Sequence, residues 1–167
     1  GIGEDGTLQK IFEKNLIPYT GSSSIISKLC MNKYNFNNFI KRKLKPQVAI
    51  KKNLYILKEI LLKNFYKMEE EALKNIWPHH WEGVFIKPND DGCSVGAMPL
   101  KSYEELLLYQ QALQQKIPTF NNIMTSLKSK DYIISEYIPV DKIAVVKNEI
   151  FYKPRSFWVE GTIGVLG

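Results

Sequence analysis

The stretch VFIKPNDDGCSVG, residues 84–96, decides the fold of this chain. Its apolar start leads through Lys87 into Pro88, and a proline ends a strand because it has no N–H for the ladder. The loop that follows contains Gly92 and Gly96, and glycines permit a positive φ and a close approach of the backbone to an anion. Two interpretations stay open at this point. The loop is either an ordinary surface turn or a phosphate clamp beside the Lys87 ammonium.

Length and composition indicate a globular chain. With 167 residues, of which 44% are hydrophobic, it can form one domain or parts of two. No stretch approaches the roughly 20 apolar residues that span a bilayer, and the first residues do not resemble a signal peptide. We therefore expect an intracellular, cytoplasmic protein with no membrane partner. Cys30 and Cys93 lie far apart, and their spacing predicts neither a disulfide framework nor a zinc site.

The net charge of +6 comes mainly from a lysine-rich segment at 40–52. Such a segment is typical of solvated protein surfaces as well as of nucleic-acid grooves. Lysine dominates over arginine, and asparagine is abundant, which favours solvated faces. We expect no nucleic-acid partner, while a basic nucleic-acid-binding domain using Lys41 to Lys52 stays open as an alternative.

Hydrophobic spacing predicts mixed helices and strands, that is, an α/β (α+β) fold. Ser102 and Glu105 form the capping-box pattern at the start of one expected helix. The expected helices cover 8–15, one or two segments of 22–44, 53–77 and 102–115. The expected strands cover 47–50, 81–88, 131–139, two strands of 142–154 joined by a turn, and the segment from 156 onward.

Six short motifs occur in one order along nearly the whole chain. They are GEDGTLQ at 3–9, IPYTGS at 17–22, MNK at 31–33, VFIKP at 84–88, DGCSVG at 91–96 and SEYI at 135–138. In this order they resemble the D-alanine–D-alanine ligase family of ATP-grasp enzymes. The form is most similar to plant-type members, which carry a Trp-Val-Glu stretch like that at 158–160. A plastid location is therefore open beside the cytoplasm.

The resemblance implies an ATP site and a role for each matching residue. Lys33 and Lys87 would contact the nucleotide phosphates, and Glu160 would bond the ribose hydroxyls. The loop would close over the phosphates through Gly92, Cys93, Ser94, Val95 and Gly96, with Cys93 and Ser94 in the catalytic positions. The segment Glu136, Tyr137 and Ile138 would form the hinge that binds adenine.

The implied reaction joins D-alanine, or a similar small amino acid, to a second one through an acyl phosphate. ATP and Mg²⁺ would be the cofactors, and Glu4 and Asp5 would lie on the substrate side. We expect no metal ligand in this chain, since the family's metal-binding half lies downstream. Two positions depart from the family pattern: Cys93 replaces a serine and Asn32 replaces an aspartate.

The resemblance also predicts how a longer protein is divided. Residues 1–21 would end an N-terminal substrate-side domain, 22–138 would form the central ATP-grasp subdomain, and 139–167 would begin a C-terminal subdomain. The ATP-grasp fold would therefore be partial and this fragment inactive by itself. A non-catalytic relative that binds nucleotide, a ligase with a different second substrate, and a homodimer of the full-length protein stay open.

Overall fold

The computed structural model describes residues 2–44, 57–141, 143–152 and 154. The chain forms two compact units, residues 1–136 and 137–167, and each is considered by itself. No helix in the described part of the chain is long and apolar enough to cross a membrane.

A four-stranded antiparallel sheet is the centre of the first unit. Its strands are β1 (Glu59–Leu62), β2 (Val84–Pro88), β3 (Met98–Leu100) and β6 (Tyr132–Glu136), in the order β1-β6-β2-β3. The central strand β6 is almost wholly buried, because it has a paired neighbour on each side. The predicted strands around 81–88 and 131–139 are confirmed.

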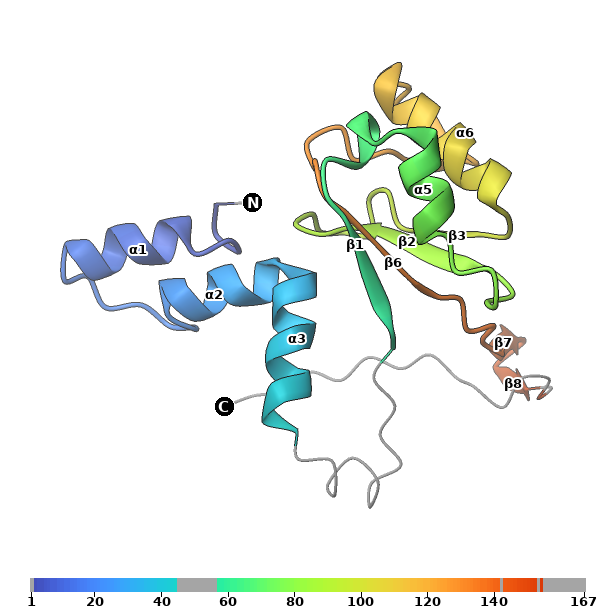
Figure 1. Ribbon diagram of the computed structural model, residues 1–167. Coiled ribbons are helices and arrows are strands. Elements are labelled where there is room, and N and C mark those ends of the chain that lie inside the picture. The colour runs from blue at the N-terminus through green and yellow to red at the C-terminus, as the bar shows by residue number, and fades with distance from the viewer. Residues whose placement is uncertain (1, 45–56, 142, 153, 155–167) are drawn as a thin grey trace. The chain divides into compact units, whose positions relative to one another are not determined.

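Two helices cover one face of this sheet, α5 (Glu70–Ile76) and α6 (Tyr103–Gln114) (Figure 1). The apolar core between them is made by residues that alternate along the strands and by one side of α6, namely Leu62, Val84, Ile86, Tyr132, Ile134, Leu106, Tyr109 and Leu113. Alternation places every second strand residue on the same face. The opposite face therefore carries Glu59, Phe85, Lys87, Ile133 and Ser135.

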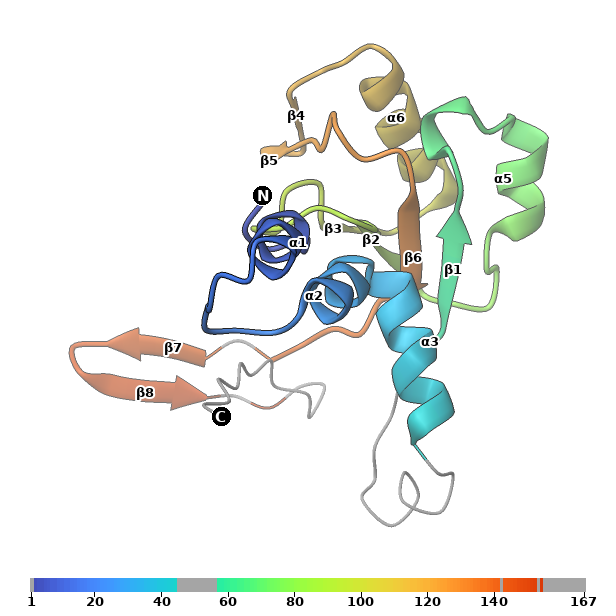
Figure 2. The same ribbon diagram turned by 90° about the vertical axis from the view of Figure 1, so that its left-hand side faces the viewer.

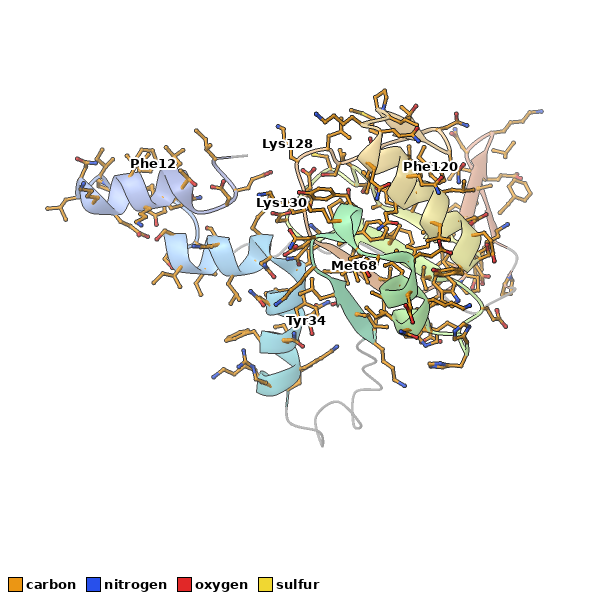
Figure 3. The ribbon with its side chains drawn as sticks, turned by 45° about the horizontal axis from the view of Figure 1, so that its top comes forward. Phe12, Tyr34, Met68, Phe120, Lys128 and Lys130 are labelled. Carbon is orange, nitrogen blue, oxygen red and sulfur yellow. The ribbon has the colours of Figure 1, made fainter. Side chains whose placement is uncertain are left out.

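The capping of α6 confirms the prediction made for its start. The Ser102 hydroxyl accepts a hydrogen bond from the Glu105 amide at 3.3 Å. The buried Gln110 side chain then donates to the carbonyl oxygens of Phe65 and Met68, at 2.7 and 2.8 Å, and so attaches α6 to the short 3₁₀ helix η1 (Phe65–Lys67). A small hairpin, β4 (Thr119–Phe120) and β5 (Ile123–Met124), follows α6. Figure 3 shows Phe120 beside α6, where its ring centroid lies 5.4 Å from that of Tyr109.

Three helices precede the sheet in the chain: α1 (Thr7–Lys14), α2 (Ser24–Met31) and α3 (Lys33–Lys43). Glu13 joins the first two, because its carboxylate accepts from the Ser24 amide at 2.8 Å and from the Ser24 hydroxyl at 2.6 Å. Gly6 allows their close approach, since a Cβ there would lie 2.3 Å from the Ser24 carbonyl oxygen. Figure 2 shows α1 and α2 next to each other, and the predicted helices in 8–15 and 22–44 are confirmed.

The expected continuous helix over 53–77 is wrong. Within residues 57–77, which the structure describes, 57 and 58 have no regular structure, β1 occupies 59–62, and only η1 and α5 are helical. Asn64 takes a left-handed conformation with φ 49°, and its amide donates to the Asp131 carboxylate at 2.9 Å. Leu62 and Phe65 both reach the core from this bent path. Pairing with β6 buries more backbone than an isolated helix would, so tertiary packing prevails over local spacing.

The second unit contains the hairpin β7 (Ile143–Val146) and β8 (Glu149–Tyr152), turned by Lys147 and Asn148 at positive φ. This confirms the two strands predicted for 142–154. Residues 153 and 155–167 and residues 45–56 lie outside the described part, and the strands predicted at 47–50 and beyond 156 lie there with them.

Candidate functional site

The loop after β2 begins at a buried residue, Asn89, that joins three segments. Its amide donates to the Asp131 carbonyl at 2.9 Å, which continues the pairing of β2 with β6. Its own carbonyl and its side-chain oxygen accept from the amides of Lys33 and Tyr34, both at 3.0 Å. These amides begin α3, where backbone N–H groups have no partner within the helix. Asn89 therefore fixes α3 against the end of β2.

This junction brings together the two lysines that the sequence singled out. The half-buried Lys33 ammonium donates to the backbone oxygen of Asp91, in the loop that follows Lys87. Burial lowers the pKa of Lys33, and repulsion from the nearby Lys87 ammonium lowers it further, although Asp90 and Asp91 act in the other direction. Two neighbouring ammonium groups form a site where an anion would be stabilised.

Lys87 itself is held by an ion pair on the face of the sheet opposite α5 and α6. Its ammonium lies 2.9 Å from a carboxylate oxygen of Glu59, whose side chain is 1% exposed. The other Glu59 oxygen is buried and has no hydrogen-bond partner among the described residues. Glu59 was not predicted as a site residue, because the apolar spacing around it predicts a helix.

The tip of the loop is exposed and turns through left-handed backbone. Cys93, Ser94 and Gly96 have φ of 54°, 56° and 68°. Within the described residues, the amides of Val95 and Ala97 bond to loop carbonyls, whereas no acceptor is found for those of Cys93 and Ser94. Two successive N–H groups lie at an exposed tip beside two lysines. This arrangement favours a phosphate-binding loop over an ordinary surface turn.

The base of the loop is attached to the segment between β5 and β6. Asp91 accepts from the Ser126 hydroxyl at 2.5 Å and from the Gly92 amide at 2.9 Å, and Asp90 accepts from Ser129 at 2.5 Å. Burial by itself would raise the pKa of Asp91, but these hydrogen bonds and the Lys33 charge hold it below its usual value. Ser126 and Ser129 gave no sequence signal, because serines between strands are common in turns.

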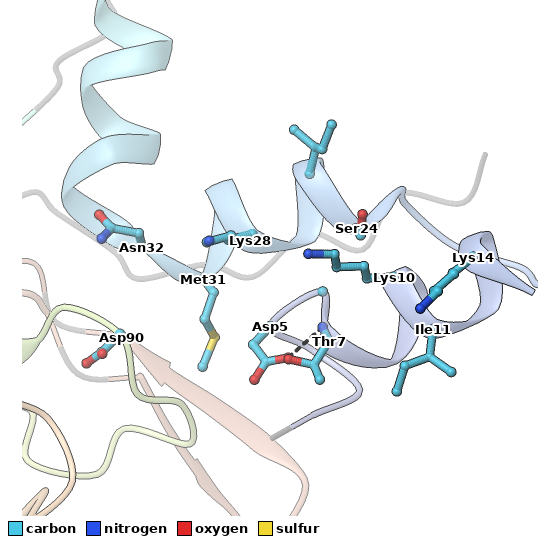
Figure 4. Close-up of a pocket in the computed structure, with 12 residues that line it drawn as sticks. Asp5, Thr7, Lys10, Ile11, Lys14, Ser24, Lys28, Met31, Asn32 and Asp90 are labelled. Carbon is cyan, nitrogen blue, oxygen red and sulfur yellow. Dashed lines mark hydrogen bonds between the residues drawn. The ribbon is translucent and has the colours of Figure 1, made fainter.

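The substrate-side candidates lie at the start of α1. A Cβ on Gly92 would lie 4.0 Å from a Glu4 carboxylate oxygen, so Glu4 is near the loop. Asp5 accepts at 2.8 Å from the amide of Thr7, the first residue of α1, and this hydrogen bond lowers the pKa of Asp5. Figure 4 shows a groove between α1 and α2 that reaches Asp90 and is lined by Asp5, Lys10, Lys14, Lys28 and Asn32, among others.

The predicted hinge residues follow the same sheet. Glu136 is the last residue of β6 and pairs with Val84 of β2. Tyr137 and Ile138 come directly after it, half-buried, at the start of the second unit. Glu160 lies outside the described residues, so its predicted contact with a ribose stays a prediction.

No metal-ligand set is found among the described residues, where no three His, Cys, Asp or Glu side chains group together. Cys30 and Cys93 are both free and exposed.

Known proteins similar to this chain were found by sequence and by structure, while no family model matches it. The chain is 30% identical over 136 residues to D-alanine–D-alanine ligase B of Clostridium perfringens, covering 81% of this chain and 36% of that protein. It is also 30% identical over 177 residues to the D-alanine–D-alanine ligase of Buchnera aphidicola, covering 96% of this chain and 50% of that protein. The chain thus spans half or less of these relatives.

The crystal structure of the VanG D-Ala:D-Ser ligase from Enterococcus faecalis has a similar fold. It aligns with a TM-score of 0.60 at 23% identity, covering 98% of this chain and 44% of that one. This similarity concerns the fold alone. It agrees with the partial ATP-grasp architecture that the sequence predicted.

Proposed function

Because this chain belongs to the D-alanine–D-alanine ligase family of ATP-grasp proteins, we propose that it is the nucleotide-binding part of an ATP-dependent ligase. The whole enzyme would join two D-alanines. One observation carries the proposal: α3 and β2 bring Lys33 and Lys87 together beside an exposed loop.

The chemistry needs a strong anion site because the polyphosphate of ATP carries several negative charges. Phosphorylation of the first carboxylate gives an acyl phosphate, and the amine of the second amino acid displaces phosphate from it. Positioning and charge neutralisation supply most of the protein's share in such phosphoryl transfers. Lys33 and Lys87 would neutralise the phosphates, and the amides of Cys93 and Ser94 would bond their oxygens.

The remaining predicted residues would place the base and the substrate. Glu136 ends β6, and Tyr137 and Ile138 come directly after it; these three residues would bind adenine, while Glu160 would bond the ribose. Glu4, near Gly92, would orient the first substrate. When bound, Mg²⁺ would offset part of the phosphate charge, and we assign it no protein ligand within the described residues.

A second candidate is a ligase with another second substrate. The similarity to a D-Ala:D-Ser ligase favours keeping it, since a common fold accommodates both substrates. A non-catalytic relative that only binds nucleotide is the third candidate.

Release of phosphate by the full-length protein tests these candidates. We expect phosphate release from ATP that depends on D-alanine. The rate of release should fall at least about 100-fold in Lys33→Met and in Lys87→Met, since each variant removes a positive charge beside the transferred phosphoryl group. Lys101→Met is the matched control, because Lys101 is exposed and follows Leu100, at the end of β3 far from Lys87. Turnover only with D-serine as second substrate would favour the second candidate. Nucleotide binding without turnover would favour the third.

A further inference from the structure

The Glu59–Lys87 ion pair is built across a strand that separates its two partners. Glu59 on β1 is in register with Ser135 on β6, which is in register with Phe85 on β2. Lys87 lies two residues after Phe85 and therefore projects from the same face. Ile133 and Ser135 of β6, which are 0% and 2% exposed, lie beneath the pair. The two long side chains therefore meet above β6.

This arrangement costs the fold more than an apolar pair would. The Glu59 side chain is almost fully buried, and its second oxygen has no partner within the described residues. Burying a carboxylate with incomplete hydrogen bonding is unfavourable, and apolar replacements of buried ion pairs are often neutral or stabilising. Stability therefore does not explain why a glutamate occupies this strand position.

The two lysines of the site differ in how their charge is balanced. Lys87 has a carboxylate at 2.9 Å, whereas the Lys33 ammonium donates to the backbone oxygen of Asp91 and is attracted by the Asp90 and Asp91 carboxylates. An ammonium has three N–H donors, so Glu59 occupies one of the donors of Lys87 and leaves two for a ligand. The lysine side chain, which is otherwise flexible, is fixed in one direction before any ligand arrives.

We propose that Glu59 is a positioning residue that acts through Lys87. Its carboxylate holds the ammonium above β6 and offsets its charge, so Lys87 meets the nucleotide as a fixed hydrogen-bond donor. This inference rests on the proposed function, and it makes Glu59 a determinant of how strongly phosphates contribute to nucleotide affinity.

Two substitutions separate anchoring from charge. Glu59→Met has a similar length and removes both the acceptor and the charge, while Glu59→Gln keeps an acceptor oxygen and removes the charge. The first readout is the ¹⁵N-detected NMR signal of the Lys87 ammonium, assigned with Lys87→Met. A held ammonium gives a signal, so we expect it in the wild type and in Glu59→Gln and expect its loss in Glu59→Met.

The second readout is the ratio of the dissociation constants of adenosine and MgADP, measured by calorimetry. Both variants leave the Lys87 charge without its counter-ion, so the ratio should rise about tenfold, as expected for one unscreened charge several ångströms from a phosphate. Glu59→Met leaves the partly buried Lys87 ammonium without its partner, so the unfolding temperature should fall, and the ratio is what separates positioning from a purely structural role.

An unchanged Lys87 signal in Glu59→Met, or an unchanged ratio in both variants, would overturn the inference. A purely structural role would lower the unfolding temperature and leave the ratio as it was. Failure of the wild type to bind either ligand would instead overturn the proposed function, and the ammonium signal would still decide whether Glu59 anchors Lys87.

Discussion

Replacement of Gly96 by alanine should destabilise the fold through the base of the loop. Gly96 has φ 68°, where an L-residue costs about 1–2 kcal/mol. A Cβ there would lie 2.9 Å from the Tyr109 hydroxyl and 3.1 Å from the Ser126 amide nitrogen. The backbone nitrogen cannot turn away, so overpacking adds about 1–3 kcal/mol. The Tyr109 hydroxyl also donates to the Gly96 carbonyl at 3.2 Å, and this bond would be strained.

These contributions predict a loss of about 3 kcal/mol in the free energy of unfolding, from about 1–2 for the backbone and 1–3 for the contacts. With a urea dependence of about 1–3 kcal/mol per molar, the unfolding midpoint should fall by about 1–3 M. Gly92→Ala is the matched control in the same loop. Its φ is not left-handed, and its added Cβ meets nothing closer than 4.0 Å.

Urea unfolding followed by tryptophan fluorescence measures both variants. Gly92→Ala should be neutral or gain up to about 1 kcal/mol, because alanine restricts the unfolded chain. Equal midpoints for the two variants would refute the reasoning, since it attributes the effect to the conformation and surroundings of Gly96 alone.

Ser126→Ala removes the hydroxyl that helps to lower the pKa of Asp91, and should cost about 1.5–3 kcal/mol near pH 7. A lowered carboxyl pKa stabilises the fold above the unfolded value of 3.8, so the greater stability of the wild type over Ser126→Ala should vanish as the pH falls below that value. Urea midpoints of both proteins at pH 2.5 to 7 measure this. A difference in midpoint that stays constant with pH would contradict the prediction. Burial raises the pKa of Tyr109 to about 12 and raises that of Tyr132 further, so stability present below pH 10 should decline from pH 10 to 12. In Tyr109→Phe this decline should be smaller, and absorbance at 295 nm should show late ionisation of the buried tyrosines; ionisation of every tyrosine near pH 10 in the folded protein would contradict this. Gln110→Leu removes the donor to the carbonyls of Phe65 and Met68 and should lower the free energy of unfolding by about 1–3 kcal/mol. Gln111→Leu, on the exposed side of α6, is the control and should have little effect. Equal effects of the two variants in thermal unfolding would count against the contact.

The sequence predicts a helix or strand correctly where its local pattern and its packing in the fold favour the same structure. The helix α6 has a capping serine and an apolar side, and β2 has alternating residues that end at Pro88. The expected helix over 53–77 was wrong because Ile60 and Leu62 also fit the alternation of a strand, and the partner β6 lies some 70 residues later. The residues of a short segment do not show which distant strand it pairs with.

The site could be predicted only in part for the same reason. The order of the motifs singled out Lys33, Lys87 and the loop, and the structure brings these together. Glu59, Asn89 and Ser126 were missed, because each acts through a partner that is distant in sequence. Polar contacts of this kind depend on the register of the strands, which spacing within one segment does not determine.

The central claim is that Lys33, Lys87 and the loop form a nucleotide site. Calorimetric titration of the full-length protein with MgADP tests it most directly, beside Lys87→Ala and the exposed control Lys101→Ala. We expect binding by the wild type and by Lys101→Ala, and an affinity at least about tenfold weaker in Lys87→Ala, because one charge-assisted contact is lost. A folded wild-type protein that binds no MgADP, or a Lys87→Ala variant that binds it equally well, would contradict the claim.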